Sequence, residues 1–139
     1  MRTFLLLSMM LVASIAGAEN KLTVVIDGIE KSEGKVLVAV YDSLTFLKQE
    51  PLYYGIAKVE EEQEEVTIEI EDVASGVYAI VVYHDANDND KLDTGTFGIP
   101  LEKFGFSNNA MGEMGPPSFQ DCMFIVEEDT EINITLIGT

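Results

Sequence analysis

The chain has 139 residues, with 25 acidic and 8 basic side chains, a formal net charge of −17 and one cysteine. This balance excludes a nucleic-acid-binding protein, because an acidic surface repels a phosphate backbone. A single cysteine excludes an internal disulfide. We therefore expect Cys122 to be a buried thiol in an apolar run, with an intermolecular bridge as the alternative.

The first eighteen residues are organised like a cleaved export signal. Arg2 gives a basic start, residues 4–16 are apolar, and Ala16-Gly17-Ala18 provides small residues for cleavage. The apolar run is shorter than the roughly 20 residues that a membrane span needs. We predict a signal peptide at 1–18 and one domain at 19–139. The protein would be exported, periplasmic or extracellular, with no membrane span, and loss of Arg2 would leave a net charge of −18.

Apolar and polar residues alternate through much of the remaining chain. A period of two places one set of side chains in a core and the other in water. We expect about seven strands, near residues 22–27, 36–40, 54–59, 66–71, 78–83, 122–126 and 132–137. This pattern predicts an all-β fold, a single antiparallel β-sandwich.

Two turns and one strand carry more specific signals. Glu33-Gly34 indicates a hairpin turn between the first two strands. Ala74-Ser75-Gly76 indicates a hairpin that enters the middle of a sheet, because residues 78–83 are nearly all apolar and suit a strand covered on both faces. Residues 84–118 have little strand pattern and are rich in Gly, Asn, Asp and Pro. Their apolar content is too high for disorder, so we predict one long ordered loop.

Oxygen-bearing residues recur at every second position at the start of this loop. A short loop with this spacing can wrap a hard cation such as calcium. The predicted metal ligands are the side chains of Asp85, Asn87, Asn89 and Asp93 and the backbone carbonyl of Lys91. Affinity would be weak, with a dissociation constant of about 10⁻⁴ to 10⁻³ M.

The loop departs from the usual helix-flanked calcium loop. Asp90 and Thr96 occupy the places of its Gly and its bidentate Glu. Asp90 can still adopt a left-handed backbone, but another carboxylate (Asp42 or Glu102) or water would have to complete the site. The alternative is an Asx-rich turn whose side chains bond their own backbone.

Two further groups are candidate functional residues. His84 precedes the loop; we favour a hydrogen-bonded histidine at a strand end, and the alternative is a hydrolase that uses His84 and nearby carboxylates. Aromatic and amide side chains farther along the loop could form a ligand surface, or the aromatics could plug the sandwich. The residues of this surface are Phe104, Phe106, Asn108 and Asn109.

The acidic run Glu60–Glu65 lies between two predicted strands. Such a run is usually a solvated turn that discourages edge pairing. Its alternative role is to attract cations or a basic partner.

Five motifs in one order along the chain resemble an uncharacterised bacterial family of small exported proteins. They are DVASGVYAI (72–80), YHDANDNDKLD (83–93), GIP (98–100), GFSNNA (105–110) and GPPSF (115–119). Together they resemble the domain of unknown function 2141 over residues 20–137. The resemblance implies export, usually to a Gram-negative periplasm or beyond, and a sandwich similar to transthyretin-like or carboxypeptidase-regulatory-like domains. It implies no known activity and no catalytic residues, and family members usually carry Gly where this chain has Asp90.

These observations predict an exported, acidic β-sandwich without enzymatic activity. We expect a binding or structural module with a calcium-type loop, whose partner is an unknown protein, peptide or glycan. The sequence does not identify that partner.

Overall fold

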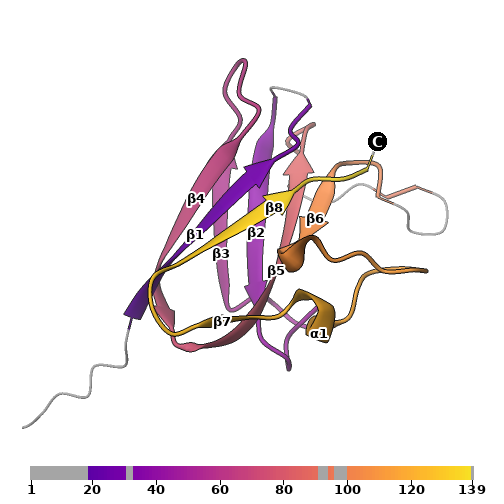
Figure 1. Cartoon of the computed structure of the whole chain (residues 1–139). Helices are drawn as coiled ribbons and strands as arrows, with labels where there is room; N and C mark the ends of the chain where they lie inside the picture. The colour runs from indigo at the N-terminus through magenta and orange to yellow at the C-terminus, as the bar shows by residue number, and fades with distance from the viewer. Residues whose placement is uncertain (1–18, 31–32, 91–93, 96–99, 139) are drawn as a thin grey trace, which may run out of the picture.

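The computed structural model describes residues 19–30, 33–90, 94–95 and 100–138, and its eight strands form two sheets (Figure 1). The strands are β1 (Glu19–Asp27), β2 (Lys35–Tyr41), β3 (Tyr53–Lys58), β4 (Val66–Ala74), β5 (Gly76–Asp85), β6 (Phe104–Phe106), β7 (Phe124–Val126) and β8 (Thr130–Thr135). Two short helices, η2 (Ser107–Asn109) and α1 (Phe119–Cys122), complete the elements. The all-β prediction is confirmed, with eight strands instead of seven. The predicted signal at 1–18 lies outside the described residues, within which no helix is long and apolar enough to cross a membrane.

The smaller sheet has the order β4-β1-β8, and the larger has the order β3-β2-β5-β6 with β7 also beside β5. β1 is antiparallel to β4 but parallel to β8, so the prediction of a wholly antiparallel arrangement is wrong at this pair. The strand missed by the sequence pattern is β6. It has only three residues with Gly105 at its centre, which is too short to display an alternation.

The two predicted hairpins are connections between sheets. β1 and β2 lie in different sheets, although Gly34 does take a turn conformation with φ of 71°. β4 and β5 also lie in different sheets on either side of Ser75. A short turn between alternating strands fits a hairpin or an arch between layers equally well, so the pattern could not separate them. The prediction that β5 lies in the middle of a sheet is confirmed, because β2 flanks it on one side and β6 and β7 on the other.

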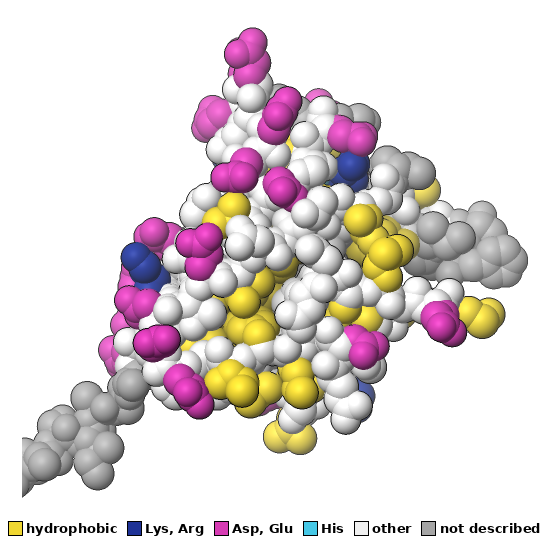
Figure 2. Space-filling view, in the orientation of Figure 1, with side chains coloured by type: hydrophobic (Ala, Val, Ile, Leu, Met, Phe, Trp, Pro, Cys, Tyr) yellow, Lys and Arg dark blue, Asp and Glu magenta, His cyan; other side chains and the backbone are white. Residues whose placement is uncertain are grey.

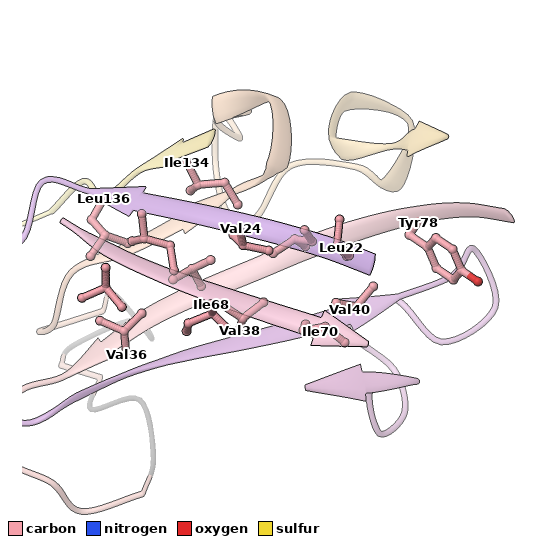
Figure 3. Packing of buried hydrophobic residues seen from close by; sticks show 14 of the residues in the cluster. Leu22, Val24, Val36, Val38, Val40, Ile68, Ile70, Tyr78, Ile134 and Leu136 are labelled. Carbon is pink, nitrogen blue, oxygen red and sulfur yellow. The ribbon is translucent and has the colours of Figure 1, made fainter. Parts of the chain in front are cut away.

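The core lies between the sheets, where alternate side chains of both point inward (Figure 3). Leu22, Val24 and Ile26 of β1 are fully buried, as are Val36 and Val40 of β2. Each such side chain contributes about 1.5–3 kcal/mol relative to exposure. The core faces predicted from the period of two are therefore confirmed for these strands.

A second apolar cluster lies on the opposite face of β5. Its buried members are Phe46, Ala79, Phe106 and Cys122, and they come from a turn, β5, β6 and α1. This cluster explains why β5 is apolar on both faces. Cys122 is a buried free thiol, as predicted, and burial together with the nearby Asp121 raises the pKa of that thiol to about 11.

Candidate cation site at the Asp85 loop

The candidate site forms where β5 ends and β2 begins. The two strands are antiparallel, and their register places Lys35 directly opposite Asp85. Asp85 is 0% exposed although it carries a carboxylate. Burial of an acid requires hydrogen-bond donors or a nearby positive charge. The loop that follows β5 supplies the donors, and Lys35 of β2 supplies a positive charge to the cluster.

Asp85 organises the loop through its own carboxylate. Its Oδ1 accepts the backbone N–H of Asn89 at 3.1 Å, and its Oδ2 accepts the backbone N–H of Asp90 at 2.7 Å. The N–H of Asp88 donates to the backbone carbonyl of Asp85 at 3.3 Å. These bonds are those of the Asx-type turn that the sequence left as an alternative.

Two left-handed residues determine the direction of the acidic side chains. Asp88 has φ of 57° and Asp90 has φ of 64°, a conformation that aspartate tolerates better than most residues. Asp85, Asp88 and Asp90 each offer one carboxylate oxygen, and these oxygens lie within 4.8 Å of one another. Two oxygens that share a calcium ion at 2.3–2.6 Å can be at most about 5 Å apart, so the donor set fits a hard divalent cation.

Of the predicted ligands, Asp85 belongs to this carboxylate cluster, and the described part of the loop adds Asp88 and Asp90 to it. Asn87 is exposed, and the backbone N–H of Asn89 bonds Asp85. Lys91 and Asp93 lie outside the described residues. Alternate spacing assumes a loop whose side chains face inward at every second residue, and the left-handed backbone at Asp88 and Asp90 breaks that regularity.

Lys35 supplies the positive charge of the cluster. Its Nζ is 3.0 Å from Asp88 Oδ1 and also bonds Asp90 Oδ1, and its side chain is only 18% exposed. Bonding to Asp90 and Asp88 raises the pKa of Lys35 above its usual value. A metal ion at this site would therefore compete with the Lys35 ammonium. The sequence pattern missed Lys35 because strand register alone brings it to the loop.

Gly34 and His84 fix the base of the site. Gly34 has φ of 71°, and a side chain there would overlap the Asp85 carbonyl and approach Ala86 Cα to 2.8 Å. Glycine therefore allows the start of β2 to approach the loop closely. His84 is buried, and its Nε2 donates to the Glu33 carbonyl at 2.6 Å. This is the hydrogen-bonded histidine at a strand end that the sequence favoured.

The two extra carboxylates considered for the site lie in different places. Asp42 follows the far end of β2, where Thr45 Oγ1 donates to its carboxylate at 2.9 Å; this bond holds the pKa of Asp42 below its usual value. Asp42 therefore does not belong to the site. Glu102 is buried. The pKa of Tyr83 is raised mainly by the burial of its own hydroxyl, and the negative charges of Asp85 and Glu102 add to this effect.

The predicted ligand surface is used largely to hold the long loop in place. Phe106 is 7% exposed and lies in the second apolar cluster, whereas Phe104 is half-buried. Asn108 Nδ2 donates to the Met123 carbonyl at 2.9 Å, and Asn109 Oδ1 accepts the Thr135 N–H at 2.9 Å. The packing of Phe106 in this cluster is what we expect of an aromatic side chain that plugs the sandwich.

Ser107 is a buried residue of this segment that the sequence did not single out. Its Oγ accepts the Ile80 N–H at 2.9 Å and donates to the Cys122 carbonyl at 2.5 Å. It thereby joins β5 to α1. A small polar residue between Phe106 and Asn108 gave no signal for this role, because both partners are distant in sequence.

Comparison with known proteins returned a family and no individual relative. Neither the curated proteins nor the solved structures gave a match. The family model DUF2141, described as an uncharacterized protein conserved in bacteria, matches residues 24–134. This range begins within β1, ends within β8 and includes the Asp85 loop. The chain therefore belongs to the DUF2141 family.

Proposed function

We propose that the protein is an exported, non-enzymatic β-sandwich module whose Asp85 loop binds a hard divalent cation of the calcium type. The proposal depends on one observation, the convergence of Asp85, Asp88 and Asp90 with oxygens within 4.8 Å. Carboxylate oxygens are the ligands that calcium prefers. The cation would stiffen the loop at the end of the larger sheet.

The net charge of the molecule favours the same function. The chain carries −17, and acidic side chains are spread over the face shown in Figure 2, where basic side chains are few. Such a field raises the local concentration of cations, with screening beyond about 8 Å at physiological salt. The same field would also attract a basic protein or peptide.

No specific observation favours the hydrolase alternative. The Nε2 of His84 bonds the Glu33 carbonyl, so a structural role accounts for this histidine. Cys122 is buried with a raised pKa, which makes it a poor nucleophile. A loop with a structural cation needs neither group.

Titration calorimetry with calcium tests the cation site, together with thermal unfolding in calcium or chelator. At about 1 mM calcium and a dissociation constant near 0.1 mM, binding should add about 1.4 kcal/mol of stability. The double substitution Asp88→Asn and Asp90→Asn should abolish the calcium heat. Asp72→Asn is the matched control, because Asp72 is an exposed aspartate with a similar φ of 59° in another part of the fold.

The Lys35→Met variant tests whether the Lys35 ammonium competes with a bound cation for Asp88 and Asp90. Removing the ammonium should tighten calcium binding, because the cation no longer displaces Lys35 from Asp88 and Asp90. Absence of calcium heat in both the unmodified protein and Lys35→Met would overturn the cation site. Sequencing the amino terminus of the purified product tests export, with Glu19 as the expected first residue.

A further inference from the structure

β3 forms one edge of the larger sheet, and its outer row of backbone groups is unused. The N–H of Val59 donates to the Gly34 carbonyl at 3.0 Å. In an antiparallel ladder the bonded residues alternate, so Ala57 and Gly55 bond β2 in the same way. Tyr54, Ile56 and Lys58 therefore direct their N–H and C=O groups away from β2. No hydrogen bond from the described part of the chain reaches those backbone groups.

The side chains of this edge are also exposed and apolar. Tyr54 is 71% exposed and Ile56 is 54% exposed, and both lie on the outer face of the sheet. In the register of β2, Ile56 lies opposite the half-buried Leu37, so the apolar surface continues into the sheet. β3 contains no acidic residue, although the chain carries −17.

The edges of the smaller sheet are β4 and β8. β8 carries the exposed Glu131, and the N–H of its last residue, Thr135, donates to Asn109 Oδ1. β4 is also protected. It presents the exposed acids Glu69 and Glu71, which discourage pairing with another strand. At the far side of the larger sheet, β6 is already bridged to the chain after β8, since Phe104 and Ile137 exchange both backbone hydrogen bonds. The acidic run Glu60–Glu65 begins only after the last residue of β3, so the six residues of β3 itself remain the edge best suited to accept a further strand.

We propose that β3 pairs with β3 of a second copy of this chain, antiparallel and about a two-fold axis at Ile56. Residues of like face must lie opposite one another in such a pair. Placing the axis at Ile56 meets this condition and brings Tyr54 opposite Lys58 of the second copy. In this register the outward N–H and C=O groups of Tyr54, Ile56 and Lys58 all find partners.

The same register also moves Lys58 next to a side chain that is not positively charged. Lys58 lies opposite Lys35 in its own sheet, and like charges placed opposite one another are unfavourable. None of the ion pairs among the described residues involves Lys58. In the dimer its ammonium would lie against the Tyr54 ring of the second copy, a cation–π contact. Ile56 would pack on its own symmetry mate.

A strand pair with few flanking contacts is a small interface, so we expect a dimer that dissociates on dilution. Sedimentation velocity on protein produced from the full-length sequence, over a hundredfold concentration range, should show a monomer–dimer equilibrium. Ile56→Lys should weaken dimerisation by about tenfold or more, which corresponds to at least about 1.4 kcal/mol. Ile125→Lys is the matched control, because Ile125 is a similarly exposed isoleucine, on β7.

A second variant tests the backbone contribution without disturbing the fold. Ile56→Pro removes an N–H that points away from β2, so the ladder between β2 and β3 stays intact. Its circular dichroism should match that of the unmodified protein while the dimer is lost. A folded Ile56→Pro variant that still dimerises as strongly as the unmodified protein would overturn the proposal.

Cysteine crosslinking tests the register. Residues opposite in a bonded antiparallel pair have Cα atoms about 5.5 Å apart, which suits a disulfide. Ile56→Cys should therefore crosslink on mild oxidation, and Tyr54→Cys should not, because its symmetry mate lies four residues along the strand. Cys122 is buried and should not interfere. A monomer at every concentration, or crosslinking by Tyr54→Cys in place of Ile56→Cys, would contradict this pairing.

Discussion

Lys35 at the start of β2 lies directly opposite Asp85 at the end of β5, and its ammonium bonds the two aspartates that fold back over Asp85. A single strand register thus places one positive charge among three carboxylates. These side chains hold the loop closed without a bound ion. The stability of the loop and its affinity for calcium should therefore change with substitutions in the loop and in β2 alike.

Replacement of Asp85 by alanine should destabilise the protein by about 2–4 kcal/mol. The change leaves the N–H groups of Asn89 and Asp90 without their acceptors in a buried setting. Asp85→Asn keeps one acceptor oxygen and should lose less. Urea unfolding at neutral pH measures both. Stability within about 0.5 kcal/mol of the unmodified protein for Asp85→Ala would show that the loop does not depend on this carboxylate.

Gly34→Ala should be among the most damaging single-methyl changes in the fold. The added Cβ meets the Asp85 carbonyl and the Ala86 backbone, and the residue has a positive φ. We expect a loss of more than about 2 kcal/mol by urea unfolding. Gly115→Ala is the control, because Gly115 also has a positive φ but nothing lies within 4 Å of a Cβ there. Equal losses for the two variants would mean that backbone strain alone, and not the close approach, explains the effect.

Phe106→Ala should cost about 3–5 kcal/mol, the usual range for a buried phenylalanine. Phe106, which lies in the loop predicted at 84–118, is packed with Phe46, Ala79 and Cys122. Met111→Ala, at a residue of the same loop that is 70% exposed, should change stability by less than about 0.5 kcal/mol. Thermal and urea unfolding separate the two. If Phe106→Ala kept full stability, a contact-surface role for this aromatic would regain support.

Cys122 should react slowly with a thiol reagent in the folded protein at pH 8. Burial, followed by Asp121, raises the pKa of the thiol to about 11, and only the thiolate reacts. Because the pKa is higher in the folded state, the associated stability is present at and below pH 8 and falls as the pH approaches 11. Ellman's reagent should label Cys122 promptly only after unfolding in urea. A Met111→Cys variant, at a residue that is 70% exposed, provides the positive control.

The sequence predicted the parts of the fold that depend on side-chain direction within one strand. Leu22, Val24 and Ile26 are buried because a strand alternates its faces whatever its neighbours are. The apolar run of β5 similarly required cover on both faces, which the core and the second apolar cluster provide.

The remaining features depend on which strands lie side by side, and this is not encoded locally. Lys35 reaches the Asp85 loop only through the pairing of β2 with β5. Asp88 and Asp90 join the cluster because their backbones are left-handed, which an alternating ligand pattern does not anticipate. The three-residue strand β6 forms because β5 offers it a partner.

The parallel pairing of β1 with β8 has a consequence for the order in which the fold can be completed. β1 is the centre of the smaller sheet, and one of its two neighbours is the last strand of the chain. A polypeptide that emerges amino-terminus first cannot close this sheet until residues 130–135 have appeared. Contacts between segments so distant in sequence form slowly, so the smaller sheet should be completed only near the end of synthesis.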